Sequence, residues 1–237
     1  MKTMFAASLI GAALFATAAP ATVTATFEAA GVQETTKTLT NKEVATFDTM
    51  SGWVGSGNIF SGAISGTITD GGFNIGGANI FGGAGGTGNF ATVYNTTTIQ
   101  LSQAVNYAGL WASAIDGDFT NSLGNTVSLY SGNTLVGSFA LMPLLSGVSS
   151  AYYGNPNVNF SGMDSNEPFA FFNFDSTTAF DRIDITQNGG GGFELDNITV
   201  GNTGAVPEPA SWALMILGFG GIGALLRSSR RKAVYQA

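Results

Sequence analysis

Carboxylates are the main reactive groups that this sequence offers. The chain has 15 Asp and Glu residues and 8 Lys and Arg residues, but neither histidine nor cysteine. Disulfides, thiolate or imidazole metal sites and a Ser-His-Asp triad are therefore excluded for this chain. What remains is oxygen chemistry, such as binding of a hard cation, hydrolysis of a glycoside by two carboxylates, or hydrogen bonding to a polar ligand.

Three oxygen-bearing residues are candidates for a structural calcium site. Glu28 lies near the first expected strand, and Asp196 and Asn197 lie in the last one. In jelly-roll domains that bind carbohydrate the first and last strands commonly meet, and hard oxygen ligands there suit Ca²⁺. Calcium is thus the one candidate cofactor. The alternative is that Glu28 is simply exposed and that Asp196 and Asn197 form a turn or bulge.

Exposed aromatic rings, on which a sugar can stack, are the second kind of candidate site. Tyr152 and Tyr153 precede a Gly154-Asn155-Pro156 turn, and Trp53 lies in a glycine-rich setting. For the two tyrosines, packing in the core is the competing interpretation. The pattern of acidic residues singles out no pair of carboxylates for glycoside hydrolysis, and we expect no enzymatic activity.

The segment that must position these residues reads as an all-β domain. Gly, Ser, Thr and Asn are abundant, and short β-branched or aromatic runs recur every ten or so residues. The pattern predicts an antiparallel two-sheet sandwich, jelly-roll-like, without a helix in the body. The expected strands are Val23–Glu28, Val44–Asp48, Asn58–Ile68, Phe73–Phe81, Thr97–Ser102, Tyr107–Ser113, Thr126–Tyr130, Thr134–Leu141, Phe169–Phe174, Phe180–Thr186 and Phe193–Val200.

Two local features of this body carry specific expectations. The glycine-rich part from Ser51 to Gly88 favours paired strands with glycine at bends, with a low-complexity loop as the alternative. The alternation of the last strand breaks near Asp196-Asn197, as a β-bulge would require. Trp111 and the Phe169–Phe174 cluster alternate like core positions, so we assign them to packing.

The charged residues are distributed unevenly along the chain. All carboxylates except Glu208 lie between Thr22 and Gly204, where Lys37, Lys42 and Arg182 are the only basic residues. So acidic a body excludes nucleic acid as a partner and disfavours an anionic membrane face. Its length fits one domain that buries about 70% of its unfolded surface.

The C-terminal tail has three consecutive parts. Pro207-Glu208-Pro209 is followed by Trp212 and Ala213, and Ala210 to Leu226 holds 17 residues without a charge. As a helix this run would be roughly 25 Å long, near the short limit for a hydrocarbon core of about 30 Å, and we expect it to span a membrane. A basic cluster ends the tail and places its C-terminal end in the cytoplasm: Arg227, Arg230, Arg231 and Lys232.

This order of motif, apolar helix and basic end resembles the PEP-CTERM sorting signal in its PEPxxWA variant. The resemblance covers Pro207 to Lys232 and implies recognition by an integral-membrane exosortase, which processes the tail in bacteria that make exopolysaccharide. Residues 207–213 would be the motif, 210–226 the transmembrane helix and 227–232 the basic end. Such a signal indicates where a protein is delivered rather than what its body does.

The N-terminus carries a second targeting segment. Lys2 is followed by an uncharged apolar run from Met4 to Ala16 and then by small residues up to Ala21. This is the pattern of a secretory signal peptide, too short to span a membrane. The chain thus divides into a signal peptide at 1–21, a β-sandwich ectodomain at 22–204 and a sorting tail at 205–237.

Several motifs in the second half of the body resemble exosortase-dependent surface proteins whose ectodomain is a carbohydrate-binding-module-like sandwich. They are Tyr107-Ala108-Gly109-Leu110-Trp111, Tyr153-Gly154-Asn155-Pro156, Glu167-Pro168-Phe169-Ala170-Phe171-Phe172-Asn173-Phe174, Phe180-Asp181-Arg182-Ile183 and Gly192-Phe193-Glu194-Leu195-Asp196-Asn197-Ile198. Together with the tail they imply an exported protein, held in the inner membrane before processing and then placed at the cell surface or in a biofilm matrix. We expect a structural or adhesive role there with exopolysaccharide as a partner; the alternatives are a glycan-binding module and, third, a secreted glycosidase.

Overall fold

The body of the chain is built from β-strands, as expected. The computed structural model describes residues 22–117, 124–155, 157, 159–188, 191–204 and 218–219. Its strands are β1 (Val23–Phe27), β2 (Thr40–Ala45), β3 (Gly52–Val54), β4 (Gly57–Ser61), β5 (Ser65–Asp70), β6 (Phe73–Gly77), β7 (Asn89–Val93), β8 (Thr96–Ser113), β9 (Thr126–Ser131), β10 (Thr134–Ala140), β11 (Ala170–Thr186) and β12 (Phe193–Asn202). Single helical turns occur at η1 (Ala84–Gly86), α1 (Leu141–Leu144) and η2 (Ser150–Tyr152).

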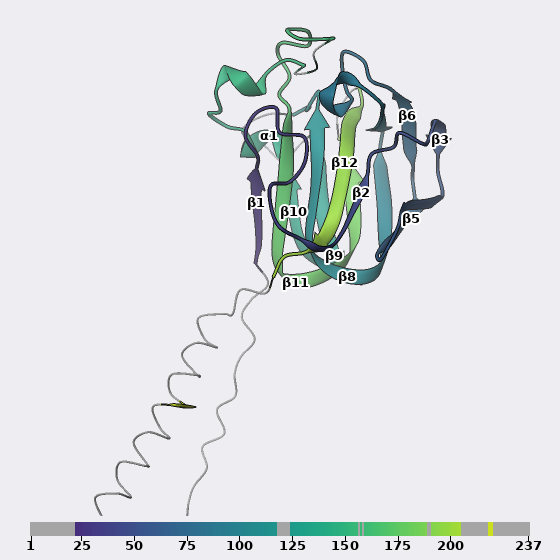
Figure 1. The fold of residues 1–237 in the computed structure, drawn as a ribbon, viewed down its shortest axis with the longest axis vertical. Helices are drawn as coiled ribbons and strands as arrows, with labels where there is room; N and C mark the ends of the chain where they lie inside the picture. Colours follow the sequence, from purple (N-terminus) through teal and green to yellow (C-terminus); the bar gives the residue numbers. More distant parts are fainter. Residues whose placement is uncertain are drawn as a thin grey trace, which may run out of the picture.

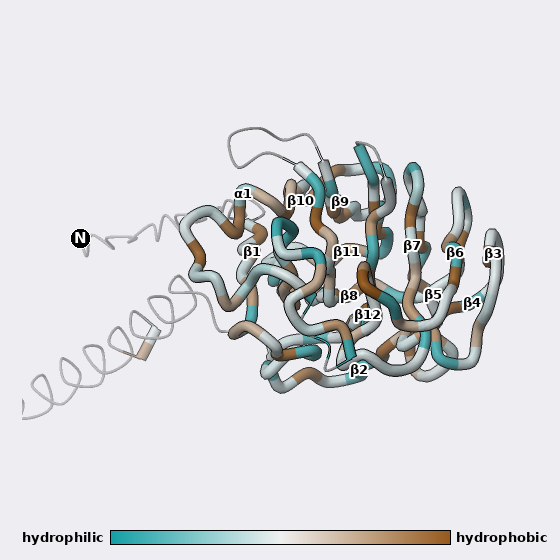
Figure 2. The backbone as a smooth tube through the Cα atoms, turned by 90° about the horizontal axis from the view of Figure 1, so that it is seen from above, coloured by the Kyte–Doolittle hydropathy of each residue, from teal (hydrophilic) through white to brown (hydrophobic). Residues whose placement is uncertain are grey.

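All of these strands belong to one antiparallel sheet. Its hydrogen-bonded path runs β10-β9-β11-β8-β12-β7-β6-β3, and the remaining strands β1, β2, β4 and β5 pair with members of that path. In Figures 1 and 2, β3 lies at one margin, whereas β8, β11 and β12 occupy the middle. The prediction of an antiparallel all-β domain is confirmed, but the bonding joins the strands into one sheet rather than two separate ones.

Two long strands explain this continuity, because each doubles back near its middle. The first half of β8 pairs with β5 and with the second half of β11, and its second half pairs with the first half of β11 and with β12. The pairing of β8 with β11 is interrupted between Asp175 and Phe180. Each of these strands was expected as two shorter strands with a break at this bend.

The sheet folds over at this bend, and the two halves of the resulting doubled sheet enclose a single apolar core. Ile99 and Leu101 of the first half of β8 pack in the same cluster as Ala108 and Leu110 of the second half. The inward-facing positions therefore change from odd to even residue numbers across the bend, since side chains alternate along a strand. This shared core fixes how the two halves of the sheet face each other.

The outer face of the second half of β8 is also covered. Tyr107 and Trp111 are fully buried there, and Trp111 packs with Phe169 and Phe171 in a second, smaller cluster. The assignment of Trp111 and the Phe169–Phe174 cluster to packing is thus confirmed.

The glycine-rich part of the chain forms paired strands, as expected, and contains β3 to β6. Gly71 and Gly72 form the turn between β5 and β6 at positive φ, and a Cβ on Gly71 would lie 2.0 Å from the Thr96 carbonyl oxygen. No other residue type fits that close approach without displacing the backbone.

Both predicted membrane-targeting helices fall on residues outside the described part. The signal peptide at 1–21 and nearly all of the tail at 205–237 lie there, so the predicted helix at 210–226 stays a prediction. Among the residues that the structure does describe, no helix has the length and apolarity to cross a membrane.

Candidate functional site: a carboxyl pocket at one end of the sheet

A pocket of about 340 Å³ opens where β8 ends and β12 begins. This volume lies within the usual range for small-molecule sites, roughly 300–1,000 Å³. Its lining combines two aromatic rings, three carboxyl groups and small residues: Phe81, Tyr94, Ala114, Asp116, Glu167, Gly191, Gly192 and Glu194.

Five separate parts of the chain bring these side chains together, one of them being the loop before β11 that carries Glu167. Asp116 follows the end of β8, and Glu194 is the second residue of β12, paired with Ser113 of β8 and Thr92 of β7. Tyr94 sits in the turn between β7 and β8. Phe81 belongs to the loop after β6, which is held in place because Ser113 Oγ donates a hydrogen bond of 2.6 Å to the Phe81 carbonyl.

Glu194 is the most buried carboxyl group of the pocket, with 8% of its surface exposed. Burial raises its pKa to about 8, although its own backbone N–H stabilises the charge, and the negative groups Glu167, Asp116 and Asp164 raise the pKa further. Glu194 therefore carries a proton at neutral pH and can donate a hydrogen bond as well as accept one.

Glu167 is perturbed in the same direction. Burial raises its pKa to about 7, and a hydrogen bond with Asp164 together with the charges of Asp164 and Asp116 adds to the effect. Raised pKa values at two neighbouring carboxyl groups are expected where acidic side chains lie close together and, among the described residues, every basic side chain of the body is paired elsewhere.

Asp116 is tied into the wall of the pocket by Gln187, which follows β11. The Gln187 side-chain amide donates to Asp116 Oδ2 over 3.0 Å and to the Gly192 carbonyl over 3.1 Å. These two bonds link the segments after β8 and before β12. They hold one carboxylate of the pocket in a fixed orientation.

Phe81 and Tyr94 give the pocket an apolar side. They are 46% and 51% exposed, unlike most large aromatic side chains in the described body. Flat exposed rings beside hydrogen-bonding carboxyl groups are suited to a ligand with one apolar face and several hydroxyl or amine groups, as sugars have.

None of the sequence-predicted site residues lines this pocket. Sequence reasoning missed it because Phe81, Tyr94, Asp116, Glu167 and Glu194 come from distant parts of the chain and follow no local spacing. The one available signal was the excess of acids over bases in the body, which predicts crowded carboxyl groups but not which of them meet.

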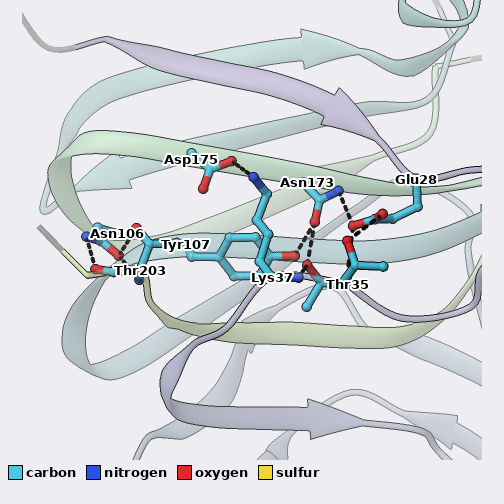
Figure 3. A network of polar contacts seen from close by, with 9 residues as sticks. Glu28, Thr35, Lys37, Asn106, Tyr107, Asn173, Asp175 and Thr203 are labelled. Carbon is cyan, nitrogen blue, oxygen red and sulfur yellow. Dashed lines mark hydrogen bonds and ion pairs between the residues drawn. The ribbon is translucent and has the colours of Figure 1, made fainter. Parts of the chain in front are cut away.

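The proposed calcium ligand Glu28 is engaged elsewhere. Its carboxylate accepts hydrogen bonds from Thr36 N (3.0 Å) and Thr36 Oγ1 (2.9 Å). It also accepts one from Asn173 Nδ2 (3.0 Å), which Figure 3 shows. The side-chain oxygen of Asn173, Oδ1, in turn accepts hydrogen bonds from Tyr107 Oη and Thr35 Oγ1. Burial alone would raise the pKa of Glu28, but these hydrogen bonds outweigh it and lower that pKa.

Asp196 and Asn197 lie in a different set of contacts. Asp196 accepts hydrogen bonds from the backbone N–H groups of Ala84 (2.9 Å) and Asn197 (2.7 Å). Asn197 adopts φ 49°, and its side chain donates to the Gln33 carbonyl over 3.0 Å. The pairing of β12 with β8 shifts register just here, so the predicted bulge is confirmed.

The structure does not bring Glu28 together with Asp196 and Asn197. The first strand pairs with β11 and the last with β8, so β11 and β8 lie between them. Three strand spacings amount to about 14 Å, and the buried rings of Phe171 and Trp111 occupy the intervening positions. In the described residues no group of three or more acidic side chains is placed to hold a metal ion.

The three residues predicted to stack on a glycan occupy different environments. Tyr152 is half-buried, packs edge-on against Phe27 with ring centroids 5.4 Å apart, and donates a hydrogen bond of 3.0 Å to the Glu28 carbonyl. Tyr153 is also partly buried and forms a bridge with Pro168. Trp53 is 62% exposed on β3 at the sheet margin.

The sorting residues lie outside the described part of the chain, so only comparison addresses them: Pro207, Glu208, Pro209, Trp212, Ala213, Arg227, Arg230, Arg231 and Lys232. Residues 205–232 match the family model described as the PEP-CTERM protein-sorting motif. Comparisons with curated proteins and with solved structures give no match. The predicted resemblance of the tail is therefore confirmed, and the all-β body is consistent with the resemblance to carbohydrate-binding-module-like sandwiches. This chain carries a PEP-CTERM sorting motif, which indicates an exported protein that an exosortase processes at the membrane.

Proposed function

We propose that the chain is a non-catalytic component of the cell surface or exopolysaccharide matrix, with a structural or adhesive body delivered by its C-terminal tail. The observation that carries this proposal is the match of residues 205–232 to the sorting motif. An acidic body with three basic residues suits solubility outside the cell. The doubled sheet with a shared core supports our interpretation of the body as a jelly-roll-like sandwich.

The direction of insertion follows from the charges of the tail. Its basic residues all lie beyond Leu226, which supports a cytoplasmic C-terminus and a body on the opposite side of the inner membrane. Processing near Pro207 would then release the body or transfer it to the surface. Binding of calcium as a cofactor stays an untested prediction.

Replacing Pro207-Glu208-Pro209 by three alanines tests the sorting step. Intact mass spectrometry of protein from the inner membrane, outer surface and medium should show loss of the tail in the wild type and a full-length chain in the membrane fraction for the variant. Ser211→Ala, inside the tail but outside the PEP and Trp-Ala elements, is the matched control and should be processed normally. A wild-type chain that keeps its tail and stays in the inner membrane would overturn the proposal.

A glycan-binding module is the second candidate function, and one observation favours it. The pocket between β8 and β12 combines Phe81 and Tyr94 with three carboxyl groups, which is the composition that saccharide recognition needs. A non-catalytic role predicts that oligosaccharides incubated with the protein stay uncleaved. New reducing ends that disappear in a Glu194→Gln variant would instead assign a glycosidase.

A further inference from the structure

One largely buried carboxyl group faces the cavity of the pocket. Glu194 is more than nine-tenths buried and lines the cavity, and within the described residues its own backbone N–H is the one hydrogen-bond partner of its carboxyl group. Buried carboxyl groups usually accept several hydrogen bonds or meet a cation. A ligand in the cavity would supply a further hydrogen bond or a positive charge to the Glu194 carboxyl group.

The charge of the pocket limits what that ligand can be. Asp116, Glu167 and Glu194 line it, and Asp164 lies close enough to perturb both glutamates. The three basic residues of the body are engaged in ion pairs at other places: Lys37 with Asp175, Lys42 with Glu34, and Arg182 with Asp184. Uronates, phosphates and sulfates would be repelled, whereas a cationic group would be attracted.

The aromatic side of the pocket adds a second requirement. Phe81 and Tyr94 are about half exposed and border the same cavity as the carboxyl groups. Rings in this position favour a ligand with an apolar face of C–H groups, and they also attract an ammonium group. A bare metal ion would account for the carboxyl groups but not for the two exposed aromatic rings.

We propose that the pocket binds an amino-sugar unit of a polysaccharide, with the protonated amine against Asp116, Glu167 and Glu194 and the sugar ring against Phe81 and Tyr94. The inference rests on the glycan-binding candidate above and assigns the chemical class of its ligand. It gives the body a specific attachment to polysaccharide that carries free amines. Acetylation of those amines would weaken the attachment.

Binding of this kind must release protons. Burial and the charges of Asp116 and Asp164 raise the pKa of Glu194 to about 8 and that of Glu167 to about 7, so both glutamates are protonated on the acid side of neutral pH. An ammonium group next to them favours the ionised forms and lowers both pKa values. The complex needs ionised glutamates and a protonated amine, so affinity should pass through a maximum near neutral pH and fall on its acid and alkaline sides.

Isothermal titration of the full chain, purified in detergent, can test this directly. The ligands are a β-1,4-linked glucosamine tetramer, its fully N-acetylated counterpart and a galacturonate trimer. We expect the free-amine tetramer to bind about tenfold tighter than the acetylated one, more weakly at high salt, and the uronate not to bind. Titrations at about pH 6, where the amine and both glutamates are protonated before binding, in two buffers with different ionisation enthalpies should report proton release.

Three variants assign the binding to the pocket. Glu194→Gln keeps the shape of the side chain and should weaken binding of the amine tetramer about tenfold, while removing the share of the proton release that comes from Glu194. Tyr94→Ala should weaken binding roughly 2- to 30-fold. Leu135→Ala, at an exposed apolar side chain on β10 outside the pocket lining, is the control and should bind as the wild type does. Melting curves confirm that each variant is folded.

The possible results separate the inference from the function on which it rests. Equal affinity for free and acetylated tetramers would keep a glycan site but overturn the amine. Absence of binding by either tetramer would overturn both the inference and the glycan-binding candidate, while leaving the sorting result intact. Binding of Ca²⁺ alone, with displacement of the sugar, would show a metal site and overturn the inference.

Discussion

Replacing Glu194 by glutamine should change how the stability of the protein depends on pH. In the folded chain burial raises the pKa of this carboxyl from 4.5 to about 8. As pH rises, the Glu194 carboxyl group therefore loses its proton in the unfolded chain at a lower pH than in the folded chain. The free energy of unfolding falls as pH rises from about 4.5 to about 8, because the unfolded state is favoured by ionisation that the folded state resists. Glutamine does not titrate, so the variant lacks this fall.

The size of the effect follows from the shift in pKa. Each unit corresponds to about 1.4 kcal/mol, and the part of the shift titrated between pH 5 and pH 9 amounts to about 4 kcal/mol. Because Glu194 is more than nine-tenths buried, solvent screening removes little of this value. Relative to the wild type, the variant should thus gain about 4 kcal/mol in unfolding free energy over that range.

Urea denaturation at pH 5, 7 and 9 measures this difference. Glu34→Gln, at an exposed side chain, is the control for the loss of one carboxylate from the chain. Parallel profiles for Glu194→Gln and the wild type between pH 5 and pH 9 would refute the reasoning. They would mean that the carboxyl is already ionised in the folded protein.

Three further perturbations test other parts of the structure. Tyr107→Phe removes a buried hydrogen bond to Asn173 and should lower the unfolding free energy by about 1–3 kcal/mol, as urea denaturation can show; an unchanged midpoint would mean that the bond contributes nothing. With Glu28 and Asp196 in separate sets of hydrogen bonds, EDTA should leave the melting temperature unchanged, and a fall of about 5–10 °C would restore the calcium site. Trp53→Ala should change the unfolding free energy by less than about 0.5 kcal/mol, and a larger loss would mean that Trp53 has a packing role.

The sequence predicted the class of the body well because strands and turns leave local signals. The alternation of apolar residues marks β1 and β12, and the Ser131-Gly132-Asn133 turn separates β9 from β10. It did not predict that β8 and β11 are each one long strand, because the bend near Asp175 interrupts the alternation in the same way as a loop does. The short edge strand β3 and the strand β7 were missed, since glycine-rich and alanine-containing runs carry weak strand signals.

The site was less accessible to sequence reasoning than the fold. The calcium hypothesis assumed that the first and last strands meet, and the pairing of β1 with β11 instead separates Glu28 from Asp196. The carboxyl pocket depends on long-range pairing that places Glu194 beside Ser113 and Tyr94 near both. Conversely, the sorting tail was read from sequence alone, because its signal is a linear order of residues.

The doubling back of β8 and β11 also sets the direction in which the body presents its pocket. Thr22 and Thr203 both lie at the end of the sheet where these strands turn, bonded to Thr177 (3.0 Å) and Asn106 (2.8 Å). From Asn106 to the pocket end of β8 at Ser113 the chain climbs roughly 23 Å. A body tethered through its tail would therefore carry the pocket at the end of the sheet opposite to the tether. Cleavage of the tail beyond Gly204 would remove none of the residues that line the pocket.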